Sequence, residues 1–486
     1  MLALRSKKLF PLATLLVIGG CSTTEPSRTA PIAGPLDFAA EPTYHLPSDE
    51  KLLAHGRENR ELNSIDQPPP PIALTAYQEA TNTASLIMLE QMARDRNPRL
   101  TRLYHEYQAA LAKSQYADKL PDPRFGVNVF GNALETAAGS QRANMAFSQA
   151  LPWLARLQAD EQRAIFEAYA IHAELEAESL RVEAAVRANW YRLYVLDKQI
   201  EIAKANQELL QSLIDVANAR IATGAASQGD VLLGTLELSQ LEERLLTYRR
   251  QREGVQAELN RLVGRPAETV VASPKMLTPH LPGMSAEEIS QVAINNQPEI
   301  EAAQMRTHAS RWGVEVARLM RRPEFVLSAS YYPTDDNRPP STVVDVGQDP
   351  WALGAQVSIP IWRDKYDAIE NEAKWKHQAA HASVEELTDR YESLIVDLLA
   401  EGRRSQETAT LYQATILPQA RQTLDADQAA YSNGTVEFDR VIRDYRNLLT
   451  LEVGYHQAIG DLATAIAKLS QAAGQDVALN ASSNSN

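Results

Sequence analysis

The feature that most constrains this 486-residue chain is an internal duplication with a spacing of about 200 residues. Four landmarks occur twice in the same order, and the pairs are Asn97-Pro98 with Gln297-Pro298, Asp122-Pro123 with Arg322-Pro323, Leu151-Pro152-Trp153 with Ile359-Pro360-Ile361-Trp362, and Ala222-Thr223-Gly224 with Ser432-Asn433-Gly434. This spacing is far longer than the period of about 20–50 residues in solenoid repeats. A unit repeated inside one chain is often built to surround an axis, so the duplication favours a wall or duct over an active site.

The N-terminus has the pattern of a secretory signal. Basic residues precede an apolar run from Leu9 to Ile18, which is too short to remain as a membrane-spanning helix. The run ends in Gly19-Gly20-Cys21, which resembles the cleavage box of bacterial lipoproteins, and Cys21 is the only cysteine. We therefore predict a signal peptide over residues 1–20 and acylation of Cys21, the alternative being an ordinary signal peptide with a chance cysteine.

Charge and hydropathy exclude several classes of protein. Formal net charge is −14, and the predicted signal peptide carries three positive and no negative charges, so the exported chain has a net charge of −17. An acidic chain is a poor partner for nucleic acid, because phosphate binding needs clustered Lys and Arg. No later segment is apolar over about eighteen residues, so no transmembrane helix is expected.

Composition and the positions of proline and glycine divide the rest of the chain into segments. We predict a lipidated Pro-rich tether at 21–73, a first repeat at 74–264, a linker at 265–284, a second repeat at 285–473 and a flexible tail at 474–486. Within each repeat, two short segments change from a helical period to strict alternation of apolar and small or polar residues. These segments predict strands at about 124–131, 143–151, 324–332 and 351–360. Their length and alternation fit tilted transmembrane strands, and they fit half-buried strands of a soluble sheet about as well.

Each strand pair is followed by an unusually long helical pattern. Residues 153–221 contain no proline or glycine and predict one helix about 100 Å long. Nine positions, all apolar except Gln207, alternate steps of three and four, the spacing of a coiled-coil seam: Leu193, Leu196, Ile200, Ala203, Gln207, Leu210, Ile214, Ala217 and Ile221. A returning helix is predicted at 227–263, and the second repeat predicts the same pair at 364–432 and 437–473. Pro418 predicts a kink in the longer helix of the second repeat.

Four strands in two separated hairpins cannot close a barrel by themselves. In lipid, the open edges would leave backbone groups unpaired at a cost of several kcal/mol each, so only closed barrels or helices span a membrane. If these strands enter a membrane, several copies of the chain must therefore contribute their strands to one closed barrel. The long helices would then continue this shared barrel as a tube.

The residues resemble the TolC-like outer membrane efflux family over about residues 74–472. The resemblance rests on the duplicated order of helix, strand pair and long helices, on the Asn97-Pro98 and Gln297-Pro298 breaks, and on the Trp153 and Trp362 strand exits; Ile416-Leu417-Pro418-Gln419-Ala420 and Tyr431-Ser432-Asn433-Gly434 also match. It implies a mainly α protein with a small β part and long antiparallel coiled-coil helices. It also implies a homotrimer in which four transmembrane strands per protomer form a 12-stranded barrel, continued by an α-helical periplasmic tunnel.

The resemblance also implies partners and site residues. The partners would be a periplasmic adaptor protein, an inner-membrane efflux pump and the lipid of the bacterial outer membrane. The turns at Gly224 and Gly434 would lie at the periplasmic tip, with Asp439, and less clearly Asp230, at the aperture. Rings of carboxylates in a narrow pore select cations. Alternatively, both aspartates merely stabilise helix starts, where a carboxylate favours the positive end of the dipole.

Known catalytic patterns are missing from the sequence. It contains no nucleophile elbow, Walker loop or dinucleotide fingerprint, so we expect no enzyme and no cofactor. His377 and His381 have i, i+4 spacing, but two ligands without a third make a weak metal site, and we expect none. The leading hypothesis is a passive, lipid-anchored export duct of undetermined cargo. The alternative is a lipid-tethered coiled-coil spacer without a pore, which leaves the four strands unexplained.

Overall fold

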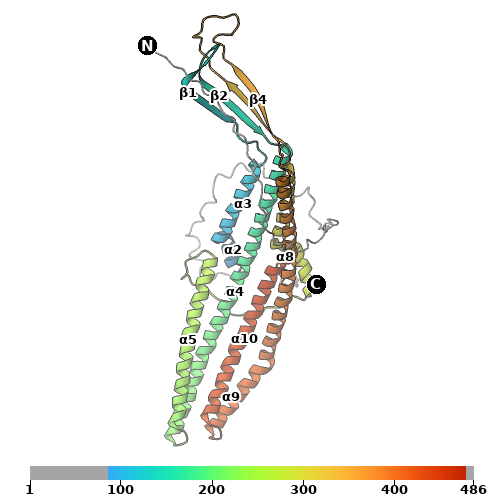
Figure 1. Cartoon of the computed structure of the whole chain (residues 1–486). Coiled ribbons are helices and arrows are strands. Elements are labelled where there is room, and N and C mark those ends of the chain that lie inside the picture. Colours follow the sequence, from blue (N-terminus) through green and yellow to red (C-terminus); the bar gives the residue numbers. More distant parts are fainter. Residues whose placement is uncertain (1–85, 478–486) are drawn as a thin grey trace, which may run out of the picture. The chain divides into compact units, whose positions relative to one another are not determined.

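The computed structural model describes residues 86–477, which belong to one compact unit. The predicted signal peptide, Cys21, the tether and residues 478–486 lie outside the described residues. In chain order the elements are α2 (Leu86–Arg96), α3 (Pro98–Tyr116), β1 (Arg124–Thr136), β2 (Gly139–Leu151), α4 (Leu154–Ala222), α5 (Gln228–Leu262), α6 (Ala286–Asn296), α7 (Pro298–Leu319), β3 (Glu324–Tyr331), β4 (Trp351–Ser358), α8 (Arg363–Leu411), η2 (Tyr412–Ile416), α9 (Leu417–Ser432) and α10 (Phe438–Ala473). Within this unit the strands lie at one end of the long helices, and the α4–α5 and α9–α10 turns lie at the other (Figure 1).

The long helices pack side by side along the predicted seam. Of the nine seam positions of α4, six are buried and Ile200, Gln207 and Ile221 are half-buried. The helix packs against α5, α7 and α10, and α10 also packs against α8. The coiled-coil prediction is therefore confirmed, because the apolar stripe is the part of α4 that the neighbouring helices cover.

The long helix of the second repeat contains one residue more than α4. The elements α8, η2 and α9 hold 49, 5 and 16 residues, a total of 70, whereas α4 holds 69. The segment η2 is π-helical, and the amide of Leu417 donates to the carbonyl of Tyr412, five residues earlier. A π-helical turn accommodates a single extra residue in an α-helix. The sequence predicted a kink at Pro418, and the structure places the π-helical segment just before this proline. The wider turn makes room for the Pro418 ring, which would clash with the preceding turn of a regular helix.

The four strands form one antiparallel sheet in the order β1-β2-β3-β4. The first hairpin extends beyond the predicted segments and turns at residues 137–138, whereas residues 332–350 connect β3 to β4. Register places the large apolar side chains on one face: one cross-strand row holds Phe125, Phe147, Ala329 and Leu353, and the next holds Val127, Met145, Tyr331 and Trp351. The other face carries small and polar residues.

The apolar face of the sheet is uncovered in a single chain. Val129 is 78% exposed, Trp351 71% and Leu353 76%. Strands β1 and β4 are the two edges, and each has one side without a strand partner among the described residues. A sheet with a bare apolar face and two free edges is incomplete in water and in lipid alike.

Candidate functional site at the helical tips

The two helical hairpins end in the same backbone motif. Gly224 has a φ of 72° and Gly434 a φ of 77°, both in the left-handed region that favours glycine. In the first tip the amide of Ala225 donates to the carbonyl of Arg220 at 2.9 Å, and in the second the amide of Thr435 donates to the carbonyl of Ala430 at 3.0 Å. These are the bonds of a Schellman helix end.

Asp230 joins the first tip to the second. It is the third residue of α5, where Ser227 Oγ donates to its Oδ1 at 2.8 Å. Its other oxygen, Oδ2, accepts a hydrogen bond from the hydroxyl of Tyr431 on α9 at 3.3 Å. The carboxylate therefore both stabilises the start of its own helix and contacts the other hairpin.

Tyr431 is the centre of the contact between the tips. Its side chain is buried, its ring lies 5.2 Å from the ring of Phe438, and the guanidinium of Arg220 lies 4.5 Å above it. Burial and the nearby carboxylate of Asp230 raise the pKa of Tyr431, so the phenol keeps its proton and remains a donor at neutral pH. Arg220, which donates to the carbonyl of Ala225 through Nη2, has a buried Nε and a buried Nη1 without hydrogen-bond partners.

A second link between the hairpins lies further from the tips. Glu237 of α5 is only 1% exposed, and Arg446 of α10 donates to its Oε2 from Nε at 2.7 Å. A buried carboxylate depends on such a partner, because an unpaired charge in this position is strongly destabilising. The two hairpins are thus connected by a neutral donor at the tip and by an ion pair further along.

Asp439 does not occupy the position equivalent to that of Asp230. It is the second residue of α10, its side chain is 56% exposed, and its Oδ2 lies 3.1 Å from Nη2 of Arg443 on the same helix. The third residue, Arg440, is the counterpart of Asp230 and pairs with Asp427 at 2.6 Å. The aspartate follows the tip glycine by six residues in the first repeat and by five in the second, and this one-residue difference gives the two tips different chemistry.

A pair of carboxyl groups on α9 and α10 was missed by the sequence analysis. Hydrogen bonding to Asp444 and to Arg440 lowers the pKa of Asp427, while burial and the Asp427 carboxylate raise the pKa of Asp444. Neither residue stands in a recognisable motif. The hydrogen bond from Tyr431 to Asp230 and the contact of Arg220 with the Tyr431 ring also escaped prediction, although Tyr431 directly precedes the Ser432-Asn433-Gly434 landmark.

Residues 86–477 contain neither a cluster of metal ligands nor a membrane-spanning helix. No group of three or more His, Cys, Asp or Glu side chains in this range is placed to hold a metal ion. The rings of His377 and His381 lie 4.8 Å apart, and His377 Nδ1 is 2.9 Å from Ser310 Oγ. None of the helices in the described part of the chain combines the length and apolarity needed to cross a membrane.

Comparison of the sequence with known families identifies an outer membrane efflux protein domain over residues 289–475. The pyoverdine export outer membrane protein OpmQ of Pseudomonas putida is 21% identical over 347 residues, which cover 68% of this chain and 71% of OpmQ. Nodulation protein T of Rhizobium leguminosarum bv. viciae is 23% identical over 312 residues, or 60% of each protein.

Solved structures share the fold at lower identity. The outer-membrane channel OprN superposes with a TM-score of 0.70 at 18% identity, covering 81% of this chain and 90% of OprN. The outer membrane protein VceC of Vibrio cholerae gives a TM-score of 0.67 at 18% identity, covering 81% of this chain and 96% of VceC. These proteins share the fold of this chain, so the predicted mainly α protein with a small β part and long helices is confirmed.

Proposed function

Because residues 289–475 match the outer membrane efflux protein family, we propose that this chain is the outer membrane channel of a tripartite efflux system. It conducts small molecules or ions passively from a periplasmic adaptor and an inner-membrane pump to the exterior, and it makes or breaks no covalent bonds. The observation that carries the proposal is the four-stranded sheet, whose apolar face and two free edges are left uncovered by the chain itself.

Three copies complete the sheet. Strand β4 of one copy pairs with β1 of the next, which gives twelve strands and removes every free edge. The apolar rows then face lipid, while the small and polar face lines the lumen. The helices continue this barrel as a periplasmic tunnel, because their apolar stripes pack against each other and against neighbouring copies.

We place the aperture at the tips formed around Gly224, Asp230, Gly434 and Asp439. The exposed Asp439 carboxylate is repeated three times in the trimer and forms a ring that favours cations. Asp230 acts differently, since its bond from Tyr431 holds the second hairpin against the first. The same tips are the surface that meets the adaptor.

The proposed signal peptide and lipid anchor lie outside the described residues. We propose that residues 1–20 are a signal peptide and that Cys21 is acylated and anchors the chain to the outer membrane, with 21–73 as its tether. The two duplicated units are 74–264 and 285–473, joined by a linker at 265–284 and followed by a tail at 474–486. Metabolic labelling of the expressed protein with a palmitate analogue, with Cys21→Ala as control, tests the anchor.

Conductance of the purified protein tests the main proposal. A detergent-resistant trimer that conducts ions across planar bilayers is expected, and monomers without conductance would instead support a lipid-tethered coiled-coil spacer. At the tip, Asp439→Ala and Asp230→Asn are both expected to raise basal conductance. The first removes a carboxylate ring that rejects anions and can be bridged by divalent ions, and the second weakens the bond from Tyr431. Unchanged conductance in both variants would place the aperture elsewhere.

A further inference from the structure

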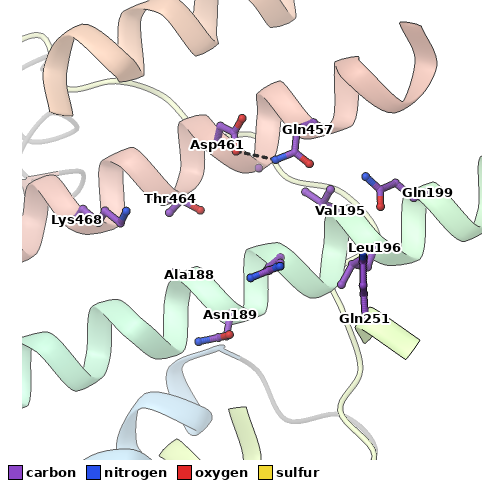
Figure 2. Close-up of a pocket in the computed structure, with 12 residues that line it drawn as sticks. Ala188, Asn189, Val195, Leu196, Gln199, Gln251, Gln457, Asp461, Thr464 and Lys468 are labelled. Atoms are coloured by element: carbon purple, nitrogen blue, oxygen red, sulfur yellow. Dashed lines mark hydrogen bonds between the residues drawn. The ribbon is translucent and has the colours of Figure 1, made fainter. Parts of the chain in front are cut away.

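A groove with a volume of about 480 Å³ lies between α4 and α10, away from the tips and the strands. Figure 2 shows Asn189 and Gln199 of α4 together with Gln457, Asp461, Thr464 and Lys468 of α10 along its walls. Arg192 of α4 and Gln251 of α5 complete the polar lining. Pockets that hold small molecules have volumes of about 300–1,000 Å³, so the groove has a suitable size.

Gly460 fixes the distance between the two helices at the groove. A Cβ atom at this position would lie 2.3 Å from Cγ2 of Val195, so α10 approaches α4 this closely only because residue 460 has no side chain. The longer side chains on either side of this contact line the groove instead of filling it. The groove is therefore a consequence of helix packing and does not depend on a flexible loop.

The groove lies on the face of α4 that is turned away from the shorter helices and the linker. Arg187, five residues before Arg192, pairs with Glu90 of α2 at 2.6 Å and with Asp476 at 3.0 Å. Tyr194, two residues after Arg192, packs in a cluster with Ile459 of α10 and Leu277 of the linker. At 3.6 residues per turn, these two positions point roughly 140° and 160° away from Arg192. In the proposed tube of long helices, the added layer of α2, α6 and linker would lie on the convex side, and the centre of the groove, around Arg192, would then face the lumen.

The charge of the groove is opposite to that of the chain as a whole. The chain has a net charge of −14, yet the groove has two exposed cations, Arg192 and Lys468, and one carboxylate, Asp461. Asp461 already accepts a hydrogen bond from Gln457 Nε2 at 2.8 Å. The acid near Lys468 on α8, Glu401, is held by Arg404 at 2.5 Å. The Asn189 amide already donates from Nδ2 to the carbonyl of Ala185 at 2.8 Å. Both cations and the amide groups of Gln199 and Gln251 therefore remain available to a ligand.

We propose that this groove is a binding subsite for anionic groups of the cargo, such as carboxylates, phosphates or sulfonates. The inference rests on the proposed duct, because only a lumen brings cargo to this face. Arg192 and Lys468 supply charge-assisted hydrogen bonds, and the neighbouring amides orient the anion. Three copies of the groove form a cationic belt that anionic cargo meets on its way between the tips and the barrel.

Neutralising the two cations tests the subsite. The double variant Arg192→Gln/Lys468→Gln is compared with Lys204→Gln/Arg403→Gln, which removes two exposed cations outside the groove lining on α4 and α8. In planar bilayers at low salt, pyrophosphate added on the barrel side is expected to block potassium chloride current through the natural channel. The concentration for half-block should rise about tenfold in the groove variant and stay unchanged in the control, because charged hydrogen bonds are lost only in the first.

Calorimetric titration of pyrophosphate into the detergent-solubilised protein gives a readout that does not require conductance. Binding that is weakened about tenfold by the groove variant alone supports the subsite. If both variants conduct and show the same block and the same pyrophosphate binding, the subsite is overturned and the proposed duct stands. Absence of conductance in every variant, natural chain included, overturns the proposed duct instead.

Discussion

The two repeats make the same junction where the shorter helices meet the end of the returning helix. In the first repeat the side chain of Asn97 caps α3 and donates from Nδ2 to the carbonyl of Leu262 at 3.0 Å. In the second, Gln297 caps α7 and donates from Nε2 to the carbonyls of Gln471 and Ala472 at 2.9 and 3.0 Å. One buried amide therefore satisfies groups at a helix start and at a helix end in both repeats.

Glycine ends the returning helix in both junctions. Gly264 and Gly474 have φ values of 67° and 73°, and each lies against the break between the two shorter helices. A Cβ at Gly264 would lie 2.9 Å from the carbonyl oxygen of Arg96, and one at Gly474 only 2.3 Å from that of Asn296. Backbone requirements have thus been retained in both copies of the unit.

Side-chain charges at the same junction are reversed between the repeats. After the first break, Arg99 pairs with Glu178 of α4 at 3.0 Å. After the second, Glu299 accepts hydrogen bonds from Arg181 at 2.5 Å, Arg390 at 2.9 Å and the Tyr391 hydroxyl at 2.5 Å. The comparison teaches that the duplicated unit is defined by backbone geometry, and that the ion pairs around it are exchangeable. Four predictions probe this distinction.

The largest effect is expected from adding a methyl group at the junction glycines. Gly474→Ala should lower the free energy of unfolding by about 3 kcal/mol or more, because it combines left-handed strain with a backbone clash. Gly264→Ala, with the looser contact, should cost about 1–2 kcal/mol. Urea unfolding in detergent measures both. Gly254→Ala, in the interior of α5 with open space around it, is the control and should be neutral or slightly stabilising.

Removing the capping amides should have the next largest effect. Gln297→Ala leaves the carbonyl of Ala472 without a donor and removes one of the two donors to the carbonyl of Gln471, and it should cost about 2–3 kcal/mol. Asn97→Ala removes only the donor to the carbonyl of Leu262 and should cost about 1–2 kcal/mol. The exposed Gln240 of α5 provides a control variant, Gln240→Ala, with little expected change. Equal losses in all three variants, measured by the same urea titration, would show that the amides do not hold the junctions together.

A smaller, pH-dependent effect is expected at Glu299. Burial raises the pKa of Glu299, but hydrogen bonds from Tyr391, Arg390 and Arg181 outweigh it, and the pKa is lowered overall. A carboxyl whose folded pKa is depressed stabilises the protein fully above its unfolded pKa of about 4.3, and this contribution disappears as pH falls through the folded pKa. Glu299→Gln should therefore be less stable than the natural chain at pH 7, and the difference should shrink with acidification.

Unfolding measured at about pH 7, 5 and 3.5 spans the range in which this contribution should disappear. Glu258→Gln removes a carboxylate that pairs with Arg261 on the protein surface, and it should lose less stability at neutral pH. A loss at Glu299 that is constant across this pH range would mean that packing, and not charge, accounts for the effect.

The comparison also separates the features that sequence reasoning can predict from those that it cannot. Strand positions, the long helix at 154–222 and the left-handed Gly224 depend on local patterns, and the structure contains them. Contacts between residues about 200 positions apart, such as Tyr431 with Asp230 and Arg446 with Glu237, depend on how helices are rotated against each other. No local pattern records that rotation, so the chemistry of the tip was only partly predictable.

The π-helical segment gives the sharpest test of the one-residue difference between the repeats. If η2 accommodates a single extra residue, deleting the exposed Gln413 together with Pro418→Ala should give a continuous α-helix of 69 residues, the length of α4. Downstream residues would keep their orientation, because a π-turn compensates the rotation that one added residue causes. The free energy of unfolding should change by less than about 1 kcal/mol, while amide exchange over residues 412–418 should slow down.

Deleting the exposed Glu386 of α8 is the matched control for this prediction. It removes a residue from a regular helix and rotates the rest of that helix by about 100° relative to its neighbours, which should abolish folding. Equal damage from both deletions would contradict the interpretation of η2 as the site of a one-residue insertion.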